Sequence, residues 1–362
     1  MGPTNGGGAA VVEEAPATPG AYLRVEDLRV RFGTPDGVVR AVDGVSFAVE
    51  RGRTLGIVGE SGSGKSVTSL AVLGLHNPKR TETTGRILVG GRDVVGMDEE
   101  AIRRLRGRDM AMIFQDPLSA LHPYYTIGRQ VAEAYRIHHP DAGRRAARTR
   151  AVEMLDRVGI PQPARRFDQY PHEFSGGMRQ RVMIAMALVN DPDLLIADEP
   201  TTALDVTVQA QILDLLADLQ REFHSAIVLI THDLGVLAQV ADEVLVMYGG
   251  RAVERGTAEQ VLRRPEHPYT WGLLSSVPSL RGDPEADLRP IGGNPPSLIN
   301  LPAGCAFHPR CRWADRTGGR SRNRVPELLP AREPGHLVAC HLPEADRGRI
   351  HREEVAQAGV AR

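Results

Sequence analysis

The sequence has only three cysteines in 362 residues and no long apolar run. An odd, small number of cysteines cannot form a complete disulfide framework, which favours a reducing compartment. No uncharged apolar run reaches the roughly 18–20 residues that a membrane-spanning helix needs. Residues 1–20 lack a basic segment followed by an apolar one, so they do not resemble a secretory signal, and their Gly, Ala and Pro content predicts a disordered leader.

The sequence also lacks an excess of charge of either sign. It has 44 basic and 45 acidic residues, which gives no overall indication of a protein that binds nucleic acid or another polyanion. Residues 144–166 are rich in arginine and predict a solvated helix surface, with a surface for a partner or for lipid headgroups as the rarer alternative. If the chain serves a membrane, we expect it to do so by docking on a separate subunit.

Short apolar runs alternate with stretches of helical periodicity, which predicts an α/β fold with a mixed, mainly parallel core sheet. An antiparallel portion is expected near the N-terminus and a hairpin at 86–95, where two glycines interrupt the run. After about Ser276, frequent prolines predict an extended connector. The expected strands are 23–32, 45–49, 55–58, 110–114, 194–197, 226–230 and 244–248. The predicted organisation is a leader at 1–20, a main domain at 21–276 with a helical subdomain at about 116–174, a small C-terminal extension at 277–346 and a polar tail at 347–362.

Residues 59–66 match the spacing G-x-x-x-x-G-K-[ST] of a phosphate-binding loop. The glycines let backbone N–H groups face the phosphates, and the positive end of the following helix faces the same anions. Lys65 would supply a positive charge to the β- and γ-phosphates, and the Ser66 hydroxyl would bind Mg²⁺. A glycine-rich turn without a ligand is the alternative, which the strand–loop–helix context disfavours. The predicted ATP-binding residues of this loop are Gly59, Glu60, Ser61, Gly62, Ser63, Gly64, Lys65 and Ser66.

The predicted strand at 194–197 ends in two carboxylates, Asp198 and Glu199. Asp198 suits Mg²⁺, directly or through water, and Glu199 lies one residue further, where it would polarise an attacking water. An acidic pair after a strand more often only caps a turn. In combination with the phosphate loop, it indicates a nucleotide hydrolase.

A second anion-binding pattern, Phe174-Ser175-Gly176-Gly177-Met178, precedes the two carboxylates. Ser175 and the amides of Gly176 and Gly177 are predicted at a helix N-terminus. The pattern resembles the signature motif of the ATP-binding-cassette (ABC) ATPases, which usually reads Leu-Ser-Gly-Gly-Gln. A serine-capped helix would be preferred if the motif stood alone. In that family the signature closes over the γ-phosphate held by the opposite subunit, so the resemblance implies a second ATPase subunit.

Further stretches resemble motifs of the same family, in the same order. Gln115 matches the Q-loop glutamine, which reaches Mg²⁺ and water, and Asp205 in Ala203-Leu204-Asp205 matches the D-loop, which contacts the partner subunit. His232 matches the switch histidine at the γ-phosphate. Phe32 resembles the aromatic that stacks on adenine, with a buried core aromatic as an equal alternative. The resemblance implies catalytic roles for Glu199, His232 and Gln115, and Mg²⁺ ligation by Ser66, Gln115 and Asp198.

Several stretches resemble the oligopeptide/dipeptide/nickel importer branch, which usually pairs two non-identical ATPases with two membrane permease subunits and an extracytoplasmic solute-binding protein. These stretches are 59–69, 175–181, 201–206, 267–269 and 295–305. The expected function is ATP hydrolysis that powers import of peptides or similar small solutes, at the cytoplasmic face of the membrane and without nucleic acid. The alternatives are an exporter ATPase, which would not be expected to carry the C-terminal extension, and a soluble ABC protein acting on DNA or ribosomes, which generally has two cassettes or a long coiled-coil insertion. A catalytically silent subunit is a further alternative, against which the intact motifs argue.

The cysteines mark a departure from this branch. Related subunits often carry four cysteines here and can bind an iron–sulfur cluster, which normally takes four thiolates. This chain has Cys305, Cys311 and Cys340, and Gly318 stands where a cysteine commonly follows Cys311 by seven residues. The count disfavours a cluster, although nearby imidazoles suit iron or zinc. The alternative expectation is three reduced thiols in a small module.

Overall fold

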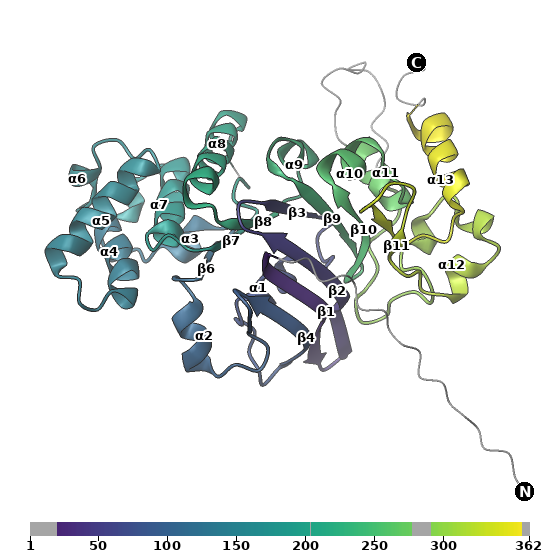
Figure 1. Ribbon diagram of the computed structural model, residues 1–362, viewed down its shortest axis with the longest axis horizontal. Coiled ribbons are helices and arrows are strands. Elements are labelled where there is room, and N and C mark those ends of the chain that lie inside the picture. Colours follow the sequence, from purple (N-terminus) through teal and green to yellow (C-terminus); the bar gives the residue numbers. More distant parts are fainter. Residues whose placement is uncertain (1–19, 203, 277–290, 357–362) are drawn as a thin grey trace, which may run out of the picture.

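The computed structural model describes residues 20–202, 204–276 and 291–356, which form two sheets with helices around them (Figure 1). The antiparallel sheet has the order β2-β1-β4-β5. Its strands are β1 (Ala21–Thr34), β2 (Gly37–Glu50), β4 (Thr81–Val89) and β5 (Arg92–Asp93). The two N-terminal strands predicted from the sequence lie within the longer β1 and β2, and the predicted hairpin at 86–95 is confirmed as the β4–β5 turn.

The second sheet has the order β11-β12-β10-β9-β3-β8-β7-β6. Its central pairs, β9–β3, β3–β8, β8–β7 and β7–β6, are all parallel, as the sequence predicts. Strands β3, β7 and β8 are buried along their whole length, which explains their unbroken apolar runs. The bounds are β3 (Thr54–Val58), β6 (Met110–Ile113), β7 (Leu194–Asp198), β8 (Ala226–Ile230), β9 (Glu243–Tyr248), β10 (Arg251–Thr257), β11 (Leu329–Pro330) and β12 (Leu337–Val338).

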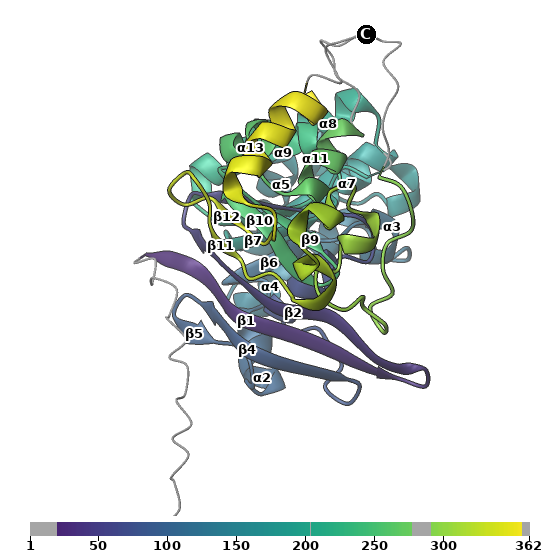
Figure 2. The same cartoon turned by 90° about the vertical axis from the view of Figure 1, so that its right-hand side faces the viewer.

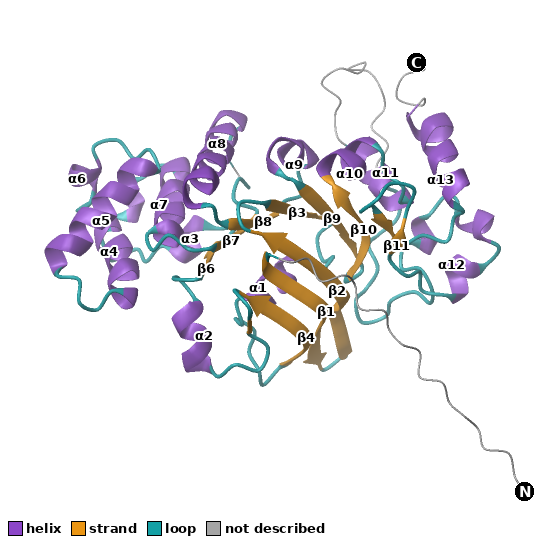
Figure 3. Cartoon of the chain, viewed as in Figure 1, coloured by secondary structure: helices purple, strands orange, loops and turns teal. Residues whose placement is uncertain are grey.

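The predicted helical subdomain forms a separate group of helices (Figure 3). It packs around a core that includes Ile127, Met154, Phe167 and Val182, all at most 7% exposed. This core is continuous with the one on the adjoining face of the parallel sheet, so the subdomain packs against the strand β7 that ends in the acidic pair. Within the predicted bounds the helices are α3 (Pro117–Ala120), α4 (Ile127–His138), α5 (Arg144–Arg157) and α6 (Pro163–Arg166), and α7 (Gly176–Leu188) joins the group from beyond them.

The remaining helices lie around and between the two sheets. Helix α8 turns an apolar face to the core, with Ile212, Leu216 and Leu219 buried. These helices are α1 (Lys65–Val72), α2 (Glu99–Leu105), α8 (Val206–Phe223), α9 (Leu234–Val240), α10 (Ala258–Arg263), α11 (Pro268–Ser275), α12 (Arg320–Asn323) and α13 (Glu344–Ile350). None of the helices in the described ranges is long and apolar enough to cross a lipid bilayer.

The C-terminal region continues the main domain instead of standing beside it. Strands β12 and β11 extend the parallel sheet through β10, with Glu254 opposite Val338, and Figure 2 shows them at one edge of that sheet. Helix α13 runs across the predicted start of the polar tail, and Arg347 and Ile350 are buried. The predicted leader up to residue 19, the connector over 277–290 and the last six residues lie outside the described residues.

Candidate active site

The loop at 59–66 leaves the carboxyl end of β3 and enters α1, as the sequence predicts. Two of its glycines are required by close backbone approach: a Cβ on Gly59 would collide with the carbonyl of Met247, and one on Gly64, at φ 103°, with the carbonyl of Ala41. The Lys65 ammonium donates to the carbonyls of Gly59 at 2.6 Å and of Glu60 at 3.0 Å. The lysine is thus held inside the loop, where phosphate oxygens can replace the two carbonyls.

Burial lowers the pKa of Lys65 below its ordinary value, and the carboxylates of Glu199, Asp198 and Glu60 act in the opposite direction. The ammonium is partly desolvated but has three anionic neighbours. Its attraction to a further anion is therefore stronger than in bulk water, because fewer water dipoles screen it.

The parallel register brings the other predicted residues to the same edge of the sheet. Ile57 of β3 and Asp198 of β7 both pair with Ile230 of β8, and Ile113 of β6 pairs with Ala197. Four strands therefore end side by side, and the segments that follow them carry the predicted motifs. Ligands in open α/β sheets bind at this carboxyl edge.

Asp198 is buried and its Oδ1 atom has no hydrogen-bond partner. Burial raises the pKa of this carboxyl, and a hydrogen bond from the Ser66 hydroxyl partly opposes the effect. A buried carboxylate oxygen without a partner is unfavourable unless a cation or a donor satisfies it. The pair of Asp198 and Ser66 supplies hard oxygen donors of the kind that Mg²⁺ prefers, so these residues fit the predicted metal.

Glu199 gathers the other predicted catalytic side chains around one oxygen. Its Oε2 accepts from Gln115 Nε2 at 2.9 Å and from the Thr202 hydroxyl at 2.9 Å, and His232 Nδ1 lies 3.5 Å away. The backbone of Glu199 is in the left-handed region, at φ 48°, which is unfavourable for a residue with a side chain and is common at functional sites. Its N–H donates to the Ile230 carbonyl at 2.8 Å, which holds this conformation.

The signature segment is placed elsewhere on the molecule. Ser175 is exposed and caps α7, its hydroxyl accepting from the Met178 N–H at 3.4 Å. Gly176 is exposed as well, whereas a Cβ on Gly177 would lie 2.8 Å from Val208. Figure 1 shows α7 among the helices of the subdomain, whereas α1 lies between the two sheets. The structure does not bring Ser175 to the phosphate loop of its own chain.

Phe32 and Asp205 have structural partners within the chain. The half-buried Phe32 ring meets the ring of His76 edge-on, with centroids 5.4 Å apart. Asp205 caps α8 by accepting from the Val208 N–H at 2.9 Å. Ala203, the first residue of the predicted D-loop, lies outside the described residues. The predicted adenine and dimer contacts of Phe32 and Asp205 stay predictions.

Sequence reasoning missed several residues that support this site. Thr202 holds Glu199, and Gln180 of α7 donates to the Pro200 carbonyl at 2.6 Å, which ties the signature helix to the turn after the acidic pair. Tyr269 and Arg310 both contact Glu60 of the phosphate loop. Gln180 and Thr202 lie inside or beside recognised motifs, so a role at the site could have been predicted for them. No sequence signal links Tyr269 or Arg310 to the loop.

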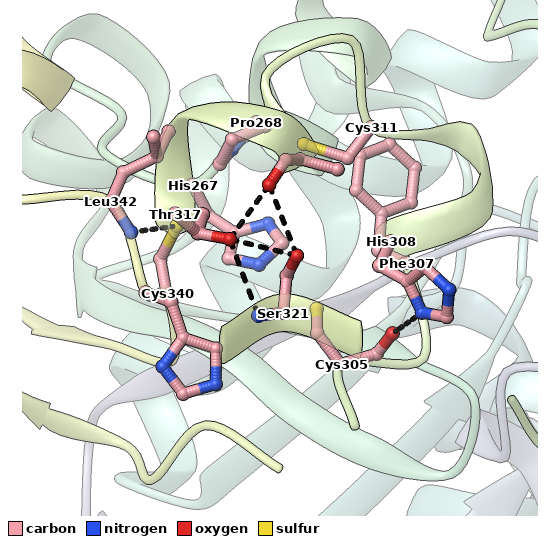
Figure 4. A pocket seen from close by; sticks show the side chains of 12 residues that line it. His267, Pro268, Cys305, Phe307, His308, Cys311, Thr317, Ser321, Cys340 and Leu342 are labelled. Carbon is pink, nitrogen blue, oxygen red and sulfur yellow. Dashed lines mark hydrogen bonds between the residues drawn. The ribbon is translucent and has the colours of Figure 1, made fainter. Parts of the chain in front are cut away.

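The three cysteines line a cavity of about 20 Å³ in the C-terminal region (Figure 4). All three are free, and burial raises the pKa of Cys305, that of Cys311 to about 11 and that of Cys340 to about 12. In the metal-free protein burial therefore favours the protonated thiols, and a metal would have to displace their protons to bind.

The remaining wall of this cavity combines three histidines and apolar side chains with two hydroxyl groups, those of Thr317 and Ser321. The other lining residues are His267, Pro268, Phe307, His308, Ala314, His341 and Leu342. Thr317 donates to the Ala314 carbonyl at 2.7 Å, and the Thr317 and Ser321 hydroxyls are 2.9 Å apart. Gly318, at the position where the resemblance leads us to expect a fourth cysteine, is exposed. Within the described ranges, no group of three or more His, Cys, Asp or Glu side chains is arranged to hold a metal ion. These donors do not fit a cluster bound by four thiolates.

Comparisons with known proteins agree with this geometry. Residues 42–202 match the family described as "ABC transporter", and residues 253–317 match "Oligopeptide/dipeptide transporter, C-terminal region". The chain is 50% identical to the oligopeptide transport ATP-binding protein OppD of Salmonella typhimurium, over 91% of this chain and 96% of that protein. It is 53% identical to the OppD protein of Bacillus subtilis, over 93% of each.

Solved structures show the same fold. The ATP-binding cassette MJ0796, described as a dimer in a post-hydrolysis state bound to ADP and Pi, superposes with a TM-score of 0.59 at 25% identity, over 65% of this chain and 98% of that one. The cassette CbiO1 of Clostridium perfringens superposes with a TM-score of 0.58 at 29% identity, over 68% and 92%. The α/β cassette predicted from the sequence is therefore confirmed.

Proposed function

The chain belongs to the ATP-binding proteins of ABC transporters, in their oligopeptide/dipeptide branch, and from this we propose that its ATP hydrolysis powers import of peptides or similar small solutes. One observation carries the chemistry: the phosphate loop with Lys65 and the acidic pair Asp198 and Glu199 lie at the same carboxyl edge of the parallel sheet, where one oxygen of the buried Asp198 has no hydrogen-bond partner. The identity of about half over nearly the whole chain supports the transported solute class.

Hydrolysis by these residues is mainly positioning and charge stabilisation. ATP binds at 59–66, and the Lys65 ammonium exchanges its two loop carbonyls for phosphate oxygens. Ser66, Gln115 and Asp198 would hold Mg²⁺, which when bound neutralises charge on the phosphate oxygens.

Glu199 acts as the general base. Its carboxylate accepts a proton from water while the water oxygen forms a bond to the γ-phosphorus and the bond to the bridging oxygen of ADP breaks. The Gln115 amide and the Thr202 hydroxyl keep Oε2 of Glu199 in place. Lys65 and His232 stabilise the negative charge on the transferred phosphoryl group.

A second ATPase subunit completes the site. Ser175 and Gly176 are exposed at the N-terminus of α7, and the Ser175–Gly177 segment would there bind the γ-phosphate of ATP held by a partner. The partner's signature segment would do the same for ATP bound at 59–66. We propose a non-identical partner, with Asp205 at the contact between the two.

Two permease subunits and an extracytoplasmic solute-binding protein form the rest of the transporter in this proposal. The cassette would sit on the permeases at the cytoplasmic face of the membrane. The Gln115 segment and the helical subdomain would transmit closure of the ATPase pair, because Gln115 contacts Glu199 and the following α3 begins two residues later.

Substitution Glu199→Gln tests the proposal. In the assembled transporter, we expect ATP turnover to fall by about 10²–10⁴, the usual cost of losing a general base, with ATP binding retained. Glu222→Gln is the matched control, since this glutamate lies on α8 and pairs with Arg157 at 2.9 Å. Uptake of a labelled oligopeptide into vesicles should stop in the first variant and continue in the second. Near-normal hydrolysis by Glu199→Gln would show that Glu199 is not the general base. ATP-dependent efflux of the peptide would show that the transporter is an exporter and not an importer.

A further inference from the structure

The C-terminal region reaches into the phosphate loop through Arg310. The side chain is only 5% exposed, and its two terminal nitrogens donate to the two carboxylate oxygens of Glu60, at 2.6 and 2.9 Å. A bidentate pair of this kind fixes both distance and orientation. Glu60 is the residue directly after Gly59, so the ion pair acts on the loop itself.

Arg310 is also held by hydrogen bonds to residues other than Glu60. Its Nε donates to the Gly292 carbonyl at 2.8 Å, and its terminal nitrogens also donate to the Ile291 carbonyl at 3.2 Å and the Tyr248 hydroxyl at 3.3 Å. These bonds leave the guanidinium little freedom. Its position is therefore set by the C-terminal region and does not simply follow Glu60.

The backbone of Glu60 is held by a second residue, Tyr269. The Glu60 N–H donates to the hydroxyl of Tyr269 at 2.7 Å. Tyr269 is fully buried on α11, against the rings of Tyr248 and Phe307. The Glu60 carbonyl in turn accepts from the Lys65 ammonium at 3.0 Å. Side chain, N–H and carbonyl of this one residue thus connect the C-terminal part of the chain to the phosphate-binding lysine.

The charge of Glu60 explains why its ion pair with Arg310 matters for ATP binding. A carboxylate in a loop that receives a triphosphate repels that ligand unless a cation offsets it. Arg310 is the cation bonded to it. We propose that Arg310 and Tyr269 are positioning residues that hold Glu60, so that the C-terminal region sets the affinity of the phosphate loop for ATP. The inference rests on the proposed ATP site at 59–66.

The test measures the dissociation constant for ATP in the purified full-length chain. For Arg310→Gln we expect ATP to bind about tenfold more weakly, the scale of losing one charge-assisted contact. In the double variant with Glu60→Gln, where no free carboxylate remains, binding should recover most of that loss. Arg322→Gln is the matched control: it lies in the same region, pairs with Asp315 at 2.9 Å on the surface, and should leave ATP affinity unchanged.

A merely structural role would not produce recovery in the double variant. If Arg310→Gln binds ATP as the unaltered chain does, or if the double variant binds as weakly as the single one, the inference is wrong. If Arg310→Gln does not fold, Tyr269→Phe, which removes one oxygen, provides the test. A loss of ATP affinity of about threefold or more supports the inference, since the Glu60 N–H is left without its partner. Unchanged ATP affinity overturns it. Failure of the unaltered chain to bind ATP would instead refute the proposed function.

Discussion

The burial of His267 predicts that the stability of this protein depends on pH. The side chain is 1% exposed, and its Nδ1 accepts from the Tyr269 N–H at 3.0 Å. Because Nδ1 is an acceptor, the ring is neutral and carries its proton on Nε2. Protonation of Nδ1 would break the cap of α11 and place a cation at the N-terminus of that helix, where the helix dipole disfavours positive charge.

Burial lowers the pKa of His267 from 6.5 to about 4, while the carboxylate of Glu254 acts in the opposite direction. Between these two values the unfolded chain binds a proton that the folded chain does not. The free energy of unfolding therefore falls as the pH falls through this window. From about pH 7 to about pH 4.5 the loss from this one group is about 2 kcal/mol, at about 1.4 kcal/mol per pKa unit.

The variant His267→Asn isolates this contribution. Asparagine also caps helices but does not titrate, so its loss of stability over the same pH range should be smaller by about 2 kcal/mol. Urea unfolding followed by circular dichroism at both pH values measures each variant against its own neutral value. If the two proteins lose the same stability on acidification, the buried histidine does not titrate as the structure requires.

Two further changes test the nucleotide and cysteine sites. Lys65→Ala removes the cation inside the phosphate loop, and we expect it to abolish ATP binding in equilibrium dialysis; a dissociation constant near that of the unaltered chain would contradict the assigned site. Protein purified without oxygen should be colourless and free of iron in elemental analysis, because three cysteines are one short of the four thiolates that a cluster normally takes; iron in proportion to protein would show that a cluster forms with a ligand other than a fourth cysteine.

The residues of the catalytic edge could be predicted from the sequence because their signals are local. The phosphate loop is one uninterrupted spacing, and β3, β7 and β8 are short apolar runs whose carboxyl ends carry the loop, the acidic pair and His232. Parallel pairing then brings these ends together without further information. The contact of Gln115 with Glu199 follows from the same logic, since the two residues lie within two positions of the ends of the neighbouring strands β6 and β7.

The C-terminal contacts could not be predicted in this way. Arg310 and Glu60 are 250 positions apart, and neither belongs to a pattern that requires the other. Strands β11 and β12 have two residues each, too few to show a period of two. Helix α13 was missed because Arg347 and its charged neighbours suggest a solvated tail, whereas Arg347 is buried at 3.1 Å from Glu266.

Glu254 shows why the C-terminal region is part of the cassette and not an appendage. This carboxylate on β10 is fully buried, and it accepts from the N–H groups of Glu266 at 2.6 Å and His267 at 3.2 Å and from His336 Nε2 at 2.8 Å. His336 belongs to the turn that leads into β12, so removal of the C-terminal region would take away one donor and open the others to water. An unsatisfied buried group costs about 1–3 kcal/mol, and more when it is charged. The same His267 caps the helix that presents Tyr269 to Glu60, so folding of this region and the shape of the phosphate loop depend on the same buried side chains.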